Sequence, residues 1–198
     1  ITNLAGLSRL TRIELDLRIE KTGLRNLEGL NNLQKIGRDF SVVSNTSLIN
    51  FKGLNNLVSI DRDFLISLNT SLDDLSGLEN LTTIGNSLSV YSNSLKTFTG
   101  IEALSSVGSF FLSYNYLLTQ LYGFKSLHSL GSFQMVSNNY LVNFAGLEAL
   151  DSIRNDFNIS DNGSLINFSG LNNLVSVNGS FIISNNYQLQ NFDGLSKL

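Results

Sequence analysis

Few residues of this chain have side chains suited to acid–base or nucleophilic chemistry. The chain has 198 residues, with one His, His128, and no Cys. The lack of Cys excludes thiolate nucleophiles, disulfides and Cys-based metal sites. A catalytic triad would need Ser and Asp side chains that converge on His128. His128 lies between the apolar residues Leu127 and Leu130, so we expect it to be a solvent-facing turn residue.

Carboxylates are the other candidates for chemistry. Asp39 and Asp63 are 24 residues apart, and each follows an Arg. A carboxylate pair separated by about 5–9.5 Å would suit a glycosidase, and the same oxygens would suit Ca²⁺. However, most equivalent positions along the chain hold Ser, at Ser87, Ser109, Ser132 and Ser180, with Asp156 between them. We therefore favour a polar position at the start of a strand and predict no enzyme, cofactor or metal, with an enzyme as the less favoured alternative.

Composition excludes further classes of function. The net charge is −3 with 13 Lys and Arg, which indicates no nucleic-acid partner. No apolar run approaches 18 residues, so we expect no membrane insertion by this segment. The chain begins with Ile and has no signal-peptide pattern, so we expect a mature or excised segment.

An internal repeat determines how all these side chains are positioned. A Gly followed by an apolar residue recurs every 23 or 24 residues. The nine anchors are Gly6, Gly29, Gly53, Gly77, Gly100, Gly123, Gly146, Gly170 and Gly194. A unit this short cannot bury its apolar side alone, whereas stacked units share a continuous core. The repeat therefore predicts one solenoid over residues 1–198, with about eight turns.

Within each repeat, apolar residues two positions apart indicate a strand. Phe40 and Val42 are an example, and Phe64 and Ile66 follow in the next repeat. Because side chains alternate along a strand, both members of a pair point inward and the residues between them point outward. We therefore expect a β-rich solenoid with a parallel sheet and little helix.

An Asn follows each predicted strand, and in the first turn Thr22 takes its place. Asn side chains bond backbone groups at turns and tolerate a left-handed backbone. Stacked Asn residues also bond one another. We predict a structural ladder of Asn45, Asn69, Asn93, Asn115, Asn138, Asn162 and Asn186.

The strand and turn from Phe40 to Asn45 match the L-x-L-x-x-N core of leucine-rich repeats, and Gly77 to Leu95 resembles repeats of the receptor L-domain type. Such repeats occur in insulin- and EGF-receptor ectodomains, fungal wall proteins and Bacteroidetes-type surface proteins. The resemblance implies a right-handed solenoid and a secreted or cell-surface adhesion or protein-binding role. The chain lacks Cys-rich modules and Pro, which favours the microbial members.

Outward strand positions supply the candidate binding site. Phe111 is the one Phe outside the apolar columns, and five of six Tyr lie between residues 91 and 140. Exposed aromatic residues on a rigid sheet suit contact with a protein or a glycan. The alternative is that a neighbouring loop covers them. The predicted site comprises Tyr91, Phe111, Ser113, Tyr114, Gln134 and Val136.

The two ends differ in charge. Twelve of the 29 charged residues fall within the first 40, and Arg18 and Glu20 occupy outward strand positions, so residues 1–28 resemble a capping turn. The last turn, from Gly194 to Leu198, is apolar. We expect this end to continue into further repeats or to meet a partner, so a self-assembling filament or wall component is the alternative function.

Overall fold

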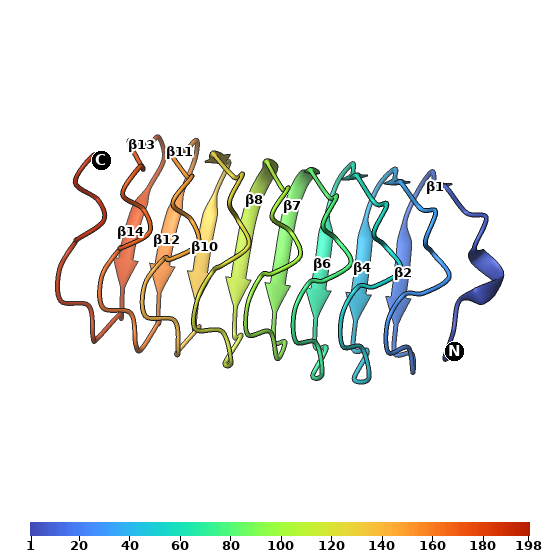
Figure 1. Ribbon diagram of the computed structural model, residues 1–198. Helices are drawn as coiled ribbons and strands as arrows, with labels where there is room; N and C mark the ends of the chain where they lie inside the picture. Colours follow the sequence, from blue (N-terminus) through green and yellow to red (C-terminus); the bar gives the residue numbers. More distant parts are fainter.

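Each turn of the chain contributes a strand to one parallel sheet that extends along the whole molecule. The computed structural model covers residues 1–198 and is a β-solenoid of about seven turns with almost no helix (Figure 1). Matching residues of successive repeats pair directly, as Phe40 does with Phe64 and Phe133 with Phe157. The main strands are β2 (Leu17–Glu20), β4 (Phe40–Val43), β6 (Phe64–Ser67), β7 (Thr83–Tyr91), β8 (Ser106–Ser113), β10 (Phe133–Val136), β12 (Phe157–Ser160) and β14 (Phe181–Ser184).

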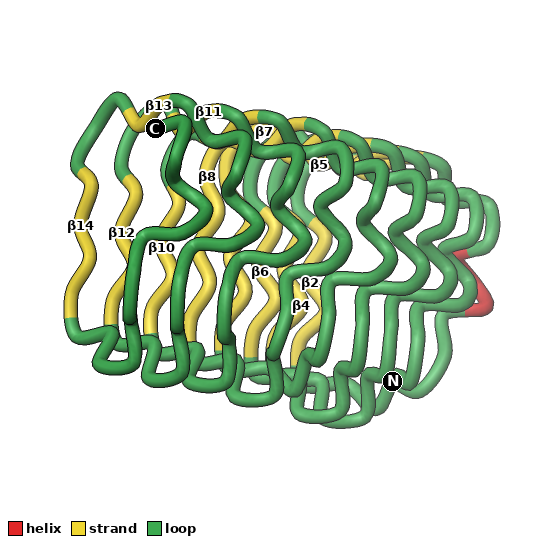
Figure 2. Tube along the Cα trace, turned by 60° about the vertical axis from the view of Figure 1, so that its left-hand side comes forward, coloured by secondary structure: helices red, strands yellow, loops and turns green.

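A second row of two-residue strands precedes the main row and was not predicted. These strands also pair in parallel and complete a 14-stranded sheet. They are β1 (Arg12–Ile13), β3 (Lys35–Ile36), β5 (Ser59–Ile60), β9 (Ser129–Leu130), β11 (Ser152–Ile153) and β13 (Ser176–Val177). The only helix is the three-residue 3-10 helix η1 (Ala5–Leu7). Figure 2 shows the strands gathered on one side of the solenoid and irregular backbone on the other.

The two rows merge in the middle of the molecule, where β7 and β8 are single strands of nine and eight residues. Three residues lie between Ile84 and Leu88, but only two lie between Val107 and Phe110. The pairing of β7 with β8 accordingly shifts register between Ile84 and Ser87.

The core is one apolar cluster of 47 buried residues. Its Phe side chains stack from turn to turn, with ring centroids 4.7 Å apart for Phe40 and Phe64 and 5.3 Å apart for Phe110 and Phe133. Because each ring contacts its equivalents in the neighbouring turns, the packing repeats with the strand spacing of roughly 4.8 Å. The core thereby holds the outer strand face rigid.

The predicted Asn ladder is present without interruption. The backbone N–H of Thr22 donates to Oδ1 of Asn45 at 2.9 Å, and each ladder Asn donates likewise to the next. Each Nδ2 also donates to a carbonyl of the preceding turn, as from Asn115 to Val90 at 3.0 Å. These side chains are buried, so the ladder satisfies backbone groups that water does not reach.

The left-handed backbone conformation is adopted by the residue before each ladder position and not by the ladder Asn itself. The eight corner residues have φ between 51° and 59° and are Lys21, Ser44, Leu68, Ser92, Tyr114, Ser137, Asp161 and Asn185. The reason is that the Asn must direct both its side chain and its N–H along the ladder. The tight corner therefore moves to the residue whose side chain is free to point outward.

Candidate functional site

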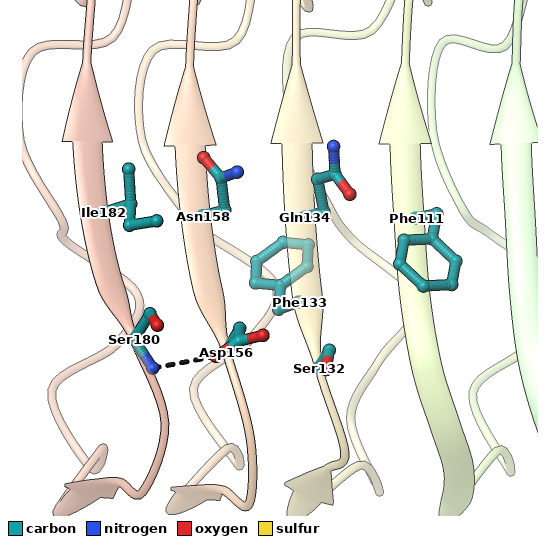
Figure 3. Close-up of a pocket in the computed structure, with 8 residues that line it drawn as sticks. All are labelled: Phe111, Ser132, Phe133, Gln134, Asp156, Asn158, Ser180 and Ile182. Carbon is teal, nitrogen blue, oxygen red and sulfur yellow. Dashed lines mark hydrogen bonds between the residues drawn. The ribbon is translucent and has the colours of Figure 1, made fainter.

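The outward face of five strands forms a shallow trough that runs along the solenoid axis. One depression of about 240 Å³ is lined by Ser89, Tyr91, Phe111, Leu112, Ser113, Gln134 and Val136. A second of about 310 Å³ is lined by Phe111, Ser132, Phe133, Gln134, Asp156, Asn158, Ser180 and Ile182 (Figure 3). The two depressions share Phe111 and Gln134, so we treat them as one site, the strand-face trough, which crosses β7, β8, β10, β12 and β14.

The side chains predicted for binding lie in or beside this trough. Tyr91 and Phe111 are each 37% exposed and Tyr114 is 45% exposed. Gln134 is also exposed, whereas Ser113 and Val136 are half-buried. No loop covers the aromatic residues, so the alternative of a covered patch does not hold.

Position along the repeat explains how these side chains meet. Phe111, Gln134, Asn158 and Ile182 are direct register partners on neighbouring strands. They consequently form a row that crosses the strands, with one side chain per turn. Figure 3 shows this row above the bend where Ser132, Asp156 and Ser180 lie.

Two amide side chains of the trough have no partner within the chain. Neither Gln134 nor Asn158 forms a side-chain hydrogen bond, and Oδ1 of Asn158 is buried without a donor. In contrast, Oδ1 and Nδ2 of every ladder Asn have partners, as for Asn162. The amide of Gln134 is exposed, so it is available to a ligand that offers both a donor and an acceptor.

The trough is almost free of charge. Asp156 is the only charged residue that lines it, and its Oδ1 accepts the backbone N–H of Ser180 at 2.8 Å. Between residues 80 and 147, the only charged side chains are Lys96, Glu102 and Lys125. The local field is therefore weak, and recognition there depends on shape, aromatic surface and hydrogen bonds.

The Asp column that first suggested glycosidase or Ca²⁺ chemistry has a structural role. Oδ1 of Asp39 accepts the backbone N–H of Asp63 at 3.3 Å, and Oδ1 of Asp63 accepts that of Ser87 at 3.1 Å. Arg62 Nε lies 3.7 Å from Asp39 Oδ1. These carboxylates thus hold the bend together from one turn to the next.

The remaining candidates for chemistry are dispersed. His128 is exposed, and its Nδ1 lies 3.9 Å from Oδ2 of Asp151, which is also exposed. No group of three or more His, Asp or Glu is arranged to hold a metal ion. No cleft brings a nucleophile, a base and a carboxylate together.

A second exposed cluster, here named the aromatic corner, lies where the chain turns after β8 and β10. It comprises Tyr114, which we predicted as part of the binding site, and Tyr116, Leu117 and Tyr140, which we did not predict. Tyr114 therefore belongs to this corner and lines neither depression of the trough. The ring centroids of Tyr114 and Tyr116 are 6.3 Å apart. In several other turns the position equivalent to Tyr116 holds Ser, Thr or Gly, at Thr46, Thr70, Ser94 and Gly163. This contrast in the sequence could have indicated the aromatic corner.

A search of known protein families and of curated proteins finds no match to this chain. Its one helix is far too short to cross a bilayer. The case for function therefore depends on the geometry of the strand face.

Proposed function

We propose that this chain is a non-enzymatic binding module that holds a protein or glycan ligand against the strand-face trough. The observation that carries the proposal is a row of outward side chains on neighbouring strands of a rigid sheet, in which Phe111 and Gln134 are exposed and Asn158 is half-buried. Aromatic anchors with adaptable polar neighbours are typical of binding surfaces.

Rigidity of the face supports this role. The inward residues of β7, β8, β10 and β12 are buried, and the ladder ties every turn to the next. A face that is ordered before binding loses little conformational entropy when a ligand arrives. More of the contact energy is then available for affinity.

The finer classification is also a proposal. We assign the chain to the leucine-rich solenoids of the receptor L-domain type, and place it in an extracellular or cell-surface setting as an adhesion module. The support is the strand-and-turn pattern from Phe40 to Asn45, repeated with Asn at the same position in later turns.

The test is a binding screen against arrays of glycans and of extracellular proteins, with wild type, Phe111→Ala and Tyr122→Ala. Tyr122 is exposed but lies outside the trough, so it is a matched control for loss of an aromatic surface residue. We expect Phe111→Ala alone to remove the strongest signals. A ligand whose binding survives Phe111→Ala would contradict the proposal.

A self-assembling structural role is the second candidate, through the C-terminal turn. There Phe192 is 58% and Leu198 48% exposed, while Leu195 is half-buried. Size-exclusion chromatography with light scattering over a concentration series tests this role. Growth in mass that Leu198→Ser abolishes would support assembly, and a monomer at every concentration would exclude it.

A further inference from the structure

We infer that the ligand of the strand-face trough is an extended, uncharged polysaccharide that lies along the solenoid axis with about one sugar ring per turn. This inference rests on the proposed function and specifies its ligand. It is drawn from the direction of the trough, the repeat of its side chains, their chemistry and their charge.

The shape of the trough suits a linear polymer. It crosses five neighbouring strands, from Tyr91 on β7 to Ile182 on β14, which is about 20 Å. It consists of two open depressions that adjoin at Phe111 and Gln134, whereas sites for small molecules enclose most of the ligand surface. A chain that lies across the strands would remain in contact along its whole length.

The repeat of the trough suits a sugar chain in particular. The row Phe111, Gln134, Asn158 and Ile182 presents one side chain every ~4.8 Å. That interval is close to the length of one pyranose ring in an extended polysaccharide. Successive rings would therefore meet successive turns without loss of register.

The side chains present the groups that a sugar ring requires. The ring of Phe111 can pack against the apolar C–H face of a pyranose, as aromatic surfaces do with apolar groups. The exposed amide of Gln134 both donates and accepts, which matches a hydroxyl group. Neither this amide nor that of Asn158 would break an internal hydrogen bond on meeting a ligand, because neither forms one within the chain.

The charge of the trough distinguishes neutral from acidic polysaccharides as ligands. The trough has no Lys or Arg to pair with carboxylate or sulfate groups, and its one charged residue is Asp156. Asp156 has no ion-pair partner, so it would repel an anionic polymer and accept hydrogen bonds from neutral hydroxyls. Uncharged polymers are favoured over acidic ones.

The backbone argues against an extended peptide as the occupant. A peptide that binds a sheet by strand addition needs an open edge with unpaired N–H and C=O groups. The strands of the trough from β8 to β12 are paired on both sides. The trough therefore presents only side chains to a ligand. Their spacing across the strands does not match the spacing of residues along an extended peptide.

The test is isothermal titration of the chain with β-1,4-linked glucose oligosaccharides of two to seven rings. Alginate oligosaccharides serve as the acidic comparison and α-1,4-linked glucose oligosaccharides as the coiled one. The variants are Phe111→Ala and Asn158→Ala in the trough, with Tyr122→Ala as the control outside it. Circular dichroism melting establishes that each variant is folded.

We expect affinity for the β-linked series to rise with length and to level off near five rings, once the trough is filled. Phe111→Ala should weaken binding about tenfold, and Asn158→Ala by several fold. Tyr122→Ala should bind like wild type. We also expect the alginate and the α-1,4-linked oligosaccharides to bind weakly.

Three results would overturn the inference in different ways. Binding of the acidic or the coiled series alone, with dependence on Phe111, would refute the ligand class and leave the proposed function intact. If no oligosaccharide binds while the array screen finds a protein ligand that depends on Phe111, the polysaccharide is wrong and the trough is a protein site. If neither experiment finds a ligand dependent on Phe111, both proposals fail.

Discussion

At the scale of single residues, position in the repeat decides what a polar side chain does. Asn115 and Asn158 have the same side chain, but the first is buried with partners for both amide atoms and the second faces the trough without any. Asp63 likewise serves the bend rather than catalysis. The position of a polar residue within the repeat, rather than its type, decides whether it has a structural role or faces the candidate binding site.

Replacement of a ladder Asn tests this distinction. Asn115→Ala removes the side-chain donor to the carbonyls of Val90 and Ser113 and the side-chain acceptor of the Asn93 N–H, although the Ser113 carbonyl keeps the N–H of Ser92. We expect the free energy of unfolding to fall by roughly 3–5 kcal/mol. Asn115→Asp should cost at least as much, because a carboxylate oxygen would then face carbonyl oxygens.

Urea denaturation measures the change, with Asn178→Ala as the control. Asn178 is exposed and forms no side-chain hydrogen bond, so its replacement should have little effect. Equal losses for Asn115→Ala and Asn178→Ala would show that the ladder contributes nothing to stability.

Leu68 offers a gain in stability. It adopts φ of 57° and is 47% exposed, so it bears left-handed strain without burying its side chain in the core. Since Asn tolerates this region better, Leu68→Asn should stabilise the chain by up to about 1 kcal/mol. Leu117→Asn is the control, as Leu117 is 50% exposed with ordinary φ. A thermal midpoint that rises for neither variant, or for both, would contradict the explanation.

At the scale of elements, the main strands and the ladder could be predicted from the sequence because they repeat in register with inward apolar residues. The second row of strands could not, since two-residue strands such as Ser59–Ile60 have no alternation to detect. The register shift between β7 and β8 was also missed. The chain is one residue shorter between Val107 and Phe110 than between Ile84 and Leu88, and this difference becomes a register shift only when the two turns pair.

At most of the Gly anchors, the backbone of one turn lies very close to the backbone of the preceding turn. Gly146 has φ of 110°, and a Cβ there would collide with the backbone of Leu121, whereas Gly6 has free space around it. Gly146→Ala should therefore cost about 3 kcal/mol or more, and Gly6→Ala well under 1 kcal/mol. Denaturant titration of both variants checks this, and equal effects would refute the packing argument.

At the scale of the whole molecule, stability is additive from turn to turn. Ladder and sheet partners lie one repeat apart in sequence, as for Asn138 and Asn162. In such a stack each turn depends only on its neighbours. The consequence is that damage at an end stays local, whereas damage in the middle separates two blocks.

Hydrogen exchange distinguishes these cases. Asn186→Ala should accelerate amide exchange mainly in the last two turns, beyond about residue 157, where Asn186 bonds Ile159 and Asn162. Asn115→Ala should accelerate exchange on both sides of β8. Uniform acceleration along the chain after Asn186→Ala would indicate that the solenoid unfolds as one unit.

The trough is built from residues of several turns, and this explains why only part of it could be predicted from the sequence. Tyr91 and Phe111 were found because aromatic residues at outward strand positions stand out from the apolar columns, and Gln134 is the outward residue of the next strand. Asn158 and Asp156 were not, because Asn and Asp are common throughout the chain. Their importance comes from adjacency across turns, which a single repeat does not reveal.

The most direct test of the central claim is an NMR titration of the ¹⁵N-labelled chain with the six-ring β-1,4-linked glucose oligosaccharide. We predict that amide shifts concentrate at the outward positions of the trough strands, around Phe111, Gln134 and Asn158, and leave the aromatic corner unchanged. Shifts confined to Tyr114, Tyr116 and Tyr140 or to the two ends would contradict the account. They would place binding away from the trough.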